Sequence, residues 1–223
     1  GSQPLQSGTF NSPNQCDNCH GGYDQATEPA YNWRGSMMAH AMRDPLYLAS
    51  LTIANQDAVD AGDLCIRCHS PGGWLEGRSV PTDGSALNNI DKEGVQCHFC
   101  HKLIDPQSTD SKDLAYMDNL THVPTQHGNG MFVVDSEDIR RGPYHNVQSN
   151  HNTSYSAFHT QSTLCGTCHD VSNPAFSKQP DGSYLPNSLF KSLDLVNLIK
   201  TFCLLSALIL TSIRLFSSII LTI

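Results

Sequence analysis

Apolar residues are unevenly distributed along this chain of 223 residues. From residue 189 onward, 22 of 35 residues are apolar, and this tail contains no Gly, Pro or His. The residues before it are poor in Leu, Ile and Val, and their short apolar stretches alternate with segments rich in Gly, Pro, Asn and Ser. This pattern predicts a mostly irregular fold with short α-helices and little β-sheet.

Local signals place a few regular elements before the tail. Asp44 and Pro45 form a typical helix start, apolar positions continue toward Val59, and Gly62 can end the helix. A second helix is expected within residues 33–42, and residues 131–134 predict a short strand. Residues 71–92 and 104–130 have the composition of loops.

Three parts are expected: an extended N-terminal arm over residues 1–15, a domain over residues 16–188, and the apolar tail over residues 189–223. The alternative for the arm is a mobile terminus. The chain lacks an initiator Met and an apolar secretion segment, which is typical of a processed, exported form. The tail has three interpretations: packed strands or an interface segment, a membrane anchor of nearly sufficient length, or a stretch foreign to the natural protein.

Composition excludes two classes of protein. The net charge of −8 with only 13 Lys and Arg excludes a basic nucleic-acid binder, and one candidate span excludes a polytopic membrane protein. The region before residue 189 also has too few aliphatic side chains to close a core easily, so another apolar body is expected to fill its interior.

The cysteines and histidines indicate what that body is. Eight of the nine cysteines occur in four copies of Cys-x-x-Cys-His, and only Cys203 lies outside them. The pattern is the attachment signal for haem c, in which two thiols form thioethers to one porphyrin and the adjacent His binds the iron. A disulfide framework and zinc sites are weaker explanations, because neither requires a histidine directly after every cysteine pair. The predicted attachment residues are Cys16, Cys19, Cys65, Cys68, Cys97, Cys100, Cys165 and Cys168, and the predicted iron ligands within the motifs are His20, His69, His101 and His169.

Seven further histidines exceed the four that a second axial ligand on every iron would require. His40 lies on the predicted helix between the first two motifs. His151 and His159 are eight residues apart, so on a helix both would share one face and could reach two haems. The fourth position is assigned to His122, with His127 and His145 as alternatives. Met37, Met38 or Met42 could replace one of these histidines as a ligand. His98 is expected to be a solvated side chain or to contact a haem propionate. Arg140 and Arg141 are expected either to pair with haem propionates or to form a solvated surface pair.

Several segments resemble a family of exported multihaem c-type cytochromes. The likeness covers Gly35-Ser-Met-Met-Ala-His40, the stretch from Cys65 to Arg78, Gly94 to His101, Arg140 to Tyr144, and Phe158 to Pro174. The size and haem count are also similar to the tetrahaem subunits of extracellular cytochrome filaments (nanowires). That closer resemblance implies a homopolymer with a continuous haem chain, in which one histidine can ligate a haem of the adjacent subunit.

The expected function is electron transfer along four closely spaced, covalently attached haems, without enzymatic activity. The alternative is a multihaem reductase or oxidase that acts on small nitrogen or sulfur oxyanions at an open haem. Expected partners are other redox proteins or extracellular electron acceptors and further copies of the chain, with no nucleic acid and with membrane contact only through the tail. Because haem c is attached outside the cytoplasm, we expect an extracellular or cell-surface location, with the periplasm as the alternative.

Overall fold

The computed structural model describes residues 5, 7–171, 176–178, 181 and 183–186. The chain divides into two units, Gly1–Val171 and Ser172–Ile223. In the second unit, β5 (Phe176–Lys178) pairs antiparallel with β6 (Tyr184–Pro186). The predicted apolar tail over residues 189–223, like the predicted boundary at residue 188 and Cys203, lies outside the described residues.

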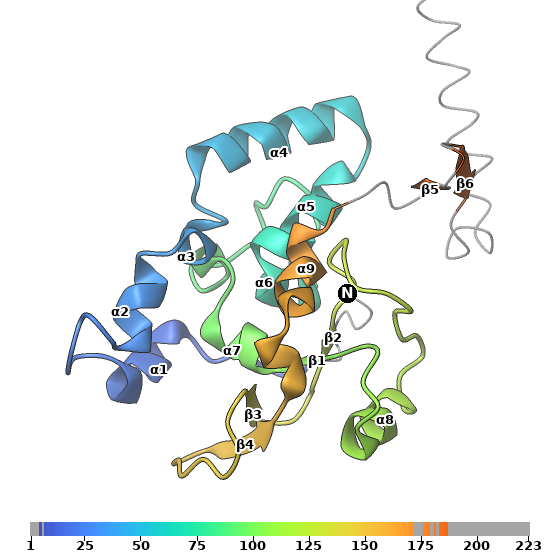
Figure 1. Ribbon diagram of the computed structural model, residues 1–223. Helices are drawn as coiled ribbons and strands as arrows, with labels where there is room; N and C mark the ends of the chain where they lie inside the picture. The colour runs from blue at the N-terminus through green and yellow to red at the C-terminus, as the bar shows by residue number, and fades with distance from the viewer. Residues whose placement is uncertain (1–4, 6, 172–175, 179–180, 182, 187–223) are drawn as a thin grey trace, which may run out of the picture. The chain divides into compact units, whose positions relative to one another are not determined.

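Short helices and irregular segments make up most of the first unit (Figure 1). In chain order, the helices are α1 (Pro13–His20), α2 (Pro29–Arg34), α3 (Met37–His40), α4 (Pro45–Asp57), α5 (Ala61–His69), α6 (Pro71–Leu75), η1 (Asp91–Glu93), α7 (Cys97–His101), α8 (Ser111–Met117), η2 (Ala157–Thr160) and α9 (Ser162–His169). The prediction of short helices in a largely irregular chain is confirmed.

Two small strand pairs complete the first unit. The antiparallel pair joins β1 (Leu103–Ile104) to β2 (Val133–Val134), which confirms the strand expected within residues 131–134. The parallel pair joins β3 (Ile139–Gly142) to β4 (Asn152–Tyr155). The prediction of little β-sheet is therefore confirmed as well.

The main apolar core contains residues from inside the cysteine motifs. Ile66 of α5 and Phe99 of α7 occupy the positions between paired cysteines, and both are buried. Phe132 meets Phe99 edge-on at 5.0 Å between ring centroids and meets Trp74 in the same way at 6.0 Å. Edge-to-face packing of this kind stabilises a core beyond the area it buries, so the aromatic cluster fixes α6 and α7 against one another.

The longest helix differs from its predicted extent. The Asp44 side chain caps α4 by accepting a hydrogen bond from the Leu46 amide at 2.9 Å, as its position predicts. The helix ends at Asp57, however, and Gly62 lies inside α5, where an added Cβ would stand 2.0 Å from the Thr82 carbonyl oxygen. Gly62 is therefore required for close packing and not for ending a helix.

Helices also occur within the predicted loops. Helices α6 and η1 fall within residues 71–92 or overlap their end, and α8 falls within residues 104–130. Helix α8 had a readable signal, since Asp110 caps it by accepting from the Lys112 amide at 2.8 Å. None of the described helices is both long enough and apolar enough to cross a membrane.

Candidate functional site

Each cysteine motif lies on a short helix. The first, second and fourth motifs end α1, α5 and α9, and the third makes up the whole of α7. Because residues three apart are neighbours on a helix surface, both cysteines of a motif face the same side. All eight motif cysteines are free thiols, and none of them is buried. The donor set therefore fits haem c, which needs two reduced, accessible thiols on one face.

Two motif histidines are oriented as iron ligands would be. His69 Nδ1 lies 2.7 Å from the Ala41 carbonyl oxygen, and His101 Nδ1 lies 2.7 Å from the Arg141 carbonyl oxygen. A carbonyl oxygen only accepts hydrogen bonds, so Nδ1 carries the hydrogen in both rings and the Nε2 lone pair remains for a metal. Such hydrogen bonds fix the tautomer and orientation of metal-binding imidazoles.

Two of the predicted second ligands lie opposite motif histidines. The ring centroids of His20 and His151 are 6.3 Å apart, and those of His101 and His159 are 5.9 Å apart. Two imidazoles bound to one metal through ~2 Å bonds place their centroids roughly 6 Å apart. The donor sets at the first and third motifs thus fit an iron with a histidine on each side.

The segment that carries these two second ligands is not a helix. His151 precedes β4 and His159 lies in η2, so the predicted shared helical face is wrong. The segment between them is extended, and the His151 ring lies near motif one while the His159 ring lies near motif three. His159 Nε2 lies 2.9 Å from the Cys100 carbonyl oxygen, while its buried Nδ1 has no hydrogen-bond partner among the described residues.

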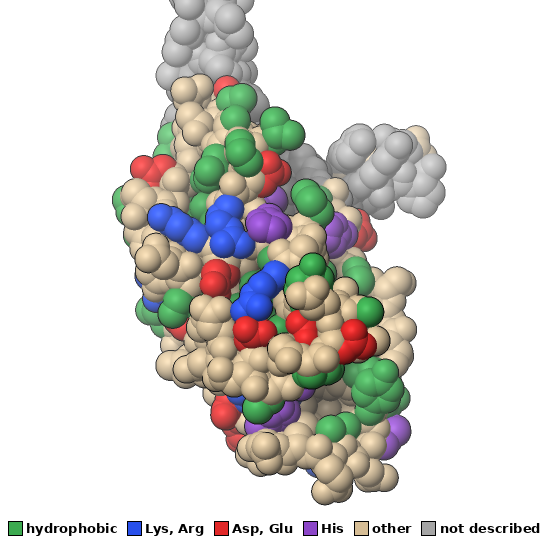
Figure 2. All heavy atoms as spheres, turned by 90° about the vertical axis from the view of Figure 1, so that its left-hand side faces the viewer, with side chains coloured by type: hydrophobic (Ala, Val, Ile, Leu, Met, Phe, Trp, Pro, Cys, Tyr) green, Lys and Arg blue, Asp and Glu red, His purple; other side chains and the backbone are tan. Residues whose placement is uncertain are grey.

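The other predicted ligands are placed less closely. His40 is exposed at the end of α3, with Arg43 Nη2 3.5 Å from its Nδ1, and both His122 and His169 are exposed. His127 Nε2 lies 2.8 Å from Asp105 Oδ1. Figure 2 shows that histidine side chains reach the surface on the face drawn there. Within the described part of the chain, neither the His40 ring nor the His122 ring meets a motif histidine, so the assignment of both as ligands stays a prediction.

His145 and the three candidate methionines lie in different surroundings. The His145 ring stacks on Tyr155 with centroids 3.6 Å apart. Met42 is buried in the core, and Met37 and Met38 are exposed on α3. Across the described ranges, no group of three or more His, Cys, Asp or Glu side chains is arranged to hold a metal ion by itself.

Thiols of different motifs lie close to one another. A hydrogen bond between the Cys16 and Cys97 thiols lowers the pKa of Cys16 to about 7 and raises the pKa of Cys97. The same interaction between Cys68 and Cys168 lowers the pKa of Cys68 and raises that of Cys168. Motif one therefore lies beside motif three, and motif two lies beside motif four.

A turn at Gly130 contacts both motif two and motif four. The Gly130 amide donates to the Thr167 carbonyl at 2.8 Å, between the cysteines of motif four. Gly130 has φ +65°, and an added Cβ would stand 2.8 Å from Arg67 Cδ and 3.1 Å from Cys68 Sγ, in motif two. A side chain at this position would be strained by its backbone and would crowd α5.

The N-terminal arm is fastened to motif three. The Asn11 amide donates to His98 Nδ1 at 2.7 Å, and Phe10 meets the His98 ring edge-on at 5.9 Å between centroids. His98 is buried, so the expectation of a solvated side chain is wrong, whereas the propionate contact stays a prediction; burial lowers the pKa of His98 to about 4. Lys102 Nζ donates to the Ser7 carbonyl at 2.8 Å. Since α1 follows directly, these contacts set motif one beside motif three.

Arg140 and Arg141 have different environments. Arg141 is buried and forms ion pairs with Asp135 and, at 3.3 Å, with Asp113. Arg140 pairs with Asp138, whose side chain is 73% exposed. Both guanidinium groups therefore form ion pairs with carboxylates of the chain. The backbone carbonyl of Arg141 also accepts the hydrogen bond from His101 Nδ1. The interpretation of a solvated pair is wrong for Arg141.

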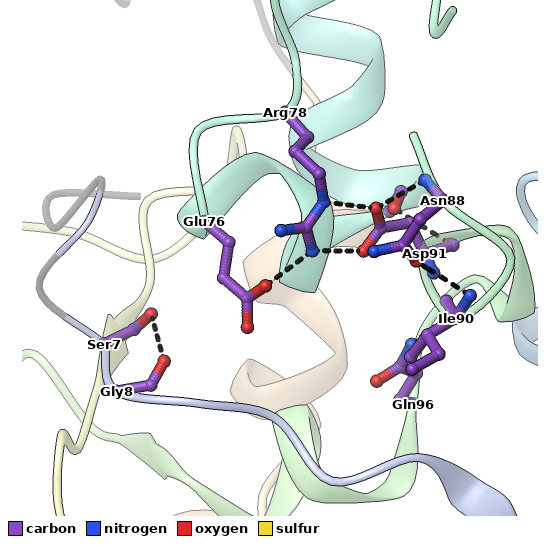
Figure 3. Close-up of polar contacts among 9 residues, drawn as sticks. Ser7, Gly8, Glu76, Arg78, Asn88, Ile90, Asp91 and Gln96 are labelled. Carbon is purple, nitrogen blue, oxygen red and sulfur yellow. Dashed lines mark hydrogen bonds and ion pairs between the residues drawn. The ribbon is translucent and has the colours of Figure 1, made fainter. Parts of the chain in front are cut away.

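A polar cluster ties motif two to motif three (Figure 3). Asp91, which is 2% exposed, accepts from Arg78 Nε at 2.6 Å and from Arg78 Nη2 at 2.7 Å. Ser70, directly after motif two, donates to the Asp91 carbonyl at 2.9 Å. Gln96, directly before motif three, donates to the Ile90 carbonyl at 2.5 Å. Sequence reasoning missed this cluster, since nothing local marks Arg78 and Asp91 as partners.

Of the comparisons with known proteins, the family match agrees with this chemistry. Residues 15–102 match the family described as cytochrome c554 and c-prime. No curated protein matches the chain. A penta-haem cytochrome c552 from Thermochromatium tepidum has a similar solved structure, with 17% sequence identity and a TM-score of 0.48. The alignment covers 82% of this chain and 49% of that one, so this chain spans about half the length of that protein.

The family match over residues 15–102 and the repeated motifs support a multihaem c-type cytochrome with haem c as its cofactor. The prediction of a chain without enzymatic activity is wrong, because multihaem cytochromes of the c552 and c554 types include redox enzymes as well as electron carriers. Electron transfer is the coarser function that these findings support for this chain.

Proposed function

We propose that this multihaem c-type cytochrome carries four haems, one at each Cys-x-x-Cys-His motif, and passes electrons along them. The two cysteines of each motif hold one haem covalently, and His20, His69, His101 and His169 bind the four irons. The haem supplies the one-electron iron couple. The role of the chain is to fix the position, ligation and surroundings of each iron.

The observation that carries the proposal is the pairing of imidazoles at motifs one and three. His151 stands opposite His20 and His159 opposite His101 at distances that suit two ligands of one iron. An iron with histidines on both sides keeps its ligands in either oxidation state, so few atoms move when an electron arrives or leaves. This arrangement favours electron transfer at these two haems.

The contacts between motifs support transfer from one haem to the next. Thiols of motifs one and three interact, as do thiols of motifs two and four. Partial burial raises the pKa of the Cys100 thiol of motif three, and the Cys165 thiol of motif four raises it further, so these two motifs are close as well. The contacts form an unbroken order of motifs: one, three, four and two.

For the cellular role, we propose an exported subunit of an extracellular homopolymeric filament that delivers electrons to redox proteins or extracellular acceptors. The four motifs and the resemblance to filament subunits support this role. The net charge of −8 becomes more negative once haem propionates are added, which favours cationic partners or mineral surfaces. Electron microscopy of native material tests it: continuous filaments of this chain are expected, and isolated monomers would contradict it.

The electronic part is tested on purified, haem-loaded protein. Absorption and EPR spectra should show six-coordinate, low-spin haem at motifs one and three. A large five-coordinate, high-spin fraction, together with turnover of nitrite, hydroxylamine or sulfite, would instead establish a redox enzyme with an open haem. Six-coordinate spectra without such turnover would support the electron conduit.

A further inference from the structure

Tyr47 packs flat against the motif-two histidine. It lies in the first turn of α4, its side chain is buried, and its ring stacks on His69 with centroids 3.7 Å apart and planes 8° apart. The Nδ1 atom of His69 also forms a hydrogen bond to the Ala41 carbonyl oxygen. Tyr47 therefore fixes the plane of the imidazole that binds the second iron.

The phenol hydroxyl is not needed for this stacking. The Tyr47 oxygen is fully buried and has no hydrogen-bond partner among the described residues. A buried Tyr hydroxyl without a partner costs free energy, whereas Phe would fill the same space and stack in the same way. Some group must therefore receive this hydrogen bond in the working protein.

The hydroxyl lies beside the haem-attachment residues of motif two. Burial raises the pKa of Tyr47, and the Cys65 and Cys68 thiols raise it further by acting on the phenolic oxygen electrostatically. The oxygen is thus near both cysteines, while the ring lies on His69. A haem attached through these three residues would lie beside this oxygen and can supply the missing acceptor.

We propose that the Tyr47 hydroxyl donates a hydrogen bond to the haem held by Cys65, Cys68 and His69, and thereby raises its reduction potential. The inference rests on the proposed attachment of a haem at motif two. A donated hydrogen bond draws electron density from the haem or weakens the negative field of its carboxylates, so it favours the reduced iron. Tyr47 is then a haem-contacting residue that distinguishes the second haem from the others.

The test uses the haem-loaded protein with Tyr47→Phe, which removes the hydroxyl and keeps the stacking. Tyr31→Phe is the matched control, because Tyr31 is 49% exposed on α2. Spectroelectrochemical titration should show one haem component of Tyr47→Phe shifted to lower potential, with about a tenfold change in its reduction equilibrium, or ~59 mV. The remaining components, and all components of Tyr31→Phe, should stay in place.

A second variant guards against misfolding of the first. 3-Fluorotyrosine at position 47 keeps the ring but makes the hydroxyl a stronger donor, so the same component should move to higher potential. The inference is overturned if both variants leave every component unchanged, or if all components shift together. Intact mass separates this outcome from failure of the proposed function, because a chain without haem at motif two lacks one macrocycle and one redox component.

Discussion

The ion pairs of the adjacent residues Arg140 and Arg141 test how much a buried ion pair near motif three contributes to the stability of the fold. Arg141 and Asp135 form an ion pair with side chains 6% and 4% exposed. Removing one partner of a buried pair costs about 3–5 kcal/mol, because the other charge stays buried. Asp113, at 3.3 Å from Arg141, still compensates part of the charge in Asp135→Asn, so a loss of about 3 kcal/mol is expected.

Thermal unfolding of the haem-loaded protein measures this loss. For a chain of this size, each kcal/mol lowers Tm by about 2–4 °C, so Asp135→Asn should lower Tm by about 6–12 °C. Asp138→Asn is the matched control, since Asp138 is 73% exposed beside Arg140 and an exposed pair contributes about 0–1 kcal/mol. Equal shifts in the two variants would refute the reasoning that burial decides the energy of these pairs.

Three further predictions concern the ligands and the contacts between motifs. His151→Ala and His159→Ala should each convert one haem to a five-coordinate, high-spin form, visible by EPR; unchanged spectra would remove that histidine from the ligand set. Phe10→Ala should lower the unfolding free energy by about 2 kcal/mol in urea titrations, since a half-buried ring is lost from the arm. Gly130→Ala should cost about 1–2 kcal/mol from its left-handed backbone, and no loss would show that the turn tolerates a side chain.

The local structure of the cysteine motifs could be predicted from the sequence, because the residues that determine it are neighbours in the chain. The spacing of Cys16, Cys19 and His20 itself requires a helical turn, and the structure has one. The same holds for the cap of α4 at Asp44, whose side chain bonds an amide two residues away. In these cases the residues that make the contact are neighbours in the chain.

Contacts between distant segments were not predictable. Asn11 and His98 are 87 residues apart, and nothing near either residue indicates the other. Residues 152–155 form β4 and not a helix, because they pair with β3, and such pairing overrides local preference. His151 and His159 lie near different motif histidines, at a strand end and in a 3-10 helix, and their assignment to two haems stays a prediction.

Intact mass and thiol alkylation of the native protein test the central claim most directly. The account predicts a mass greater than that of the polypeptide by four haems, with all eight motif cysteines protected from alkylation and four haem-bearing peptides after digestion. A folded protein at the mass of the bare polypeptide, with eight motif thiols open to alkylation, would contradict it.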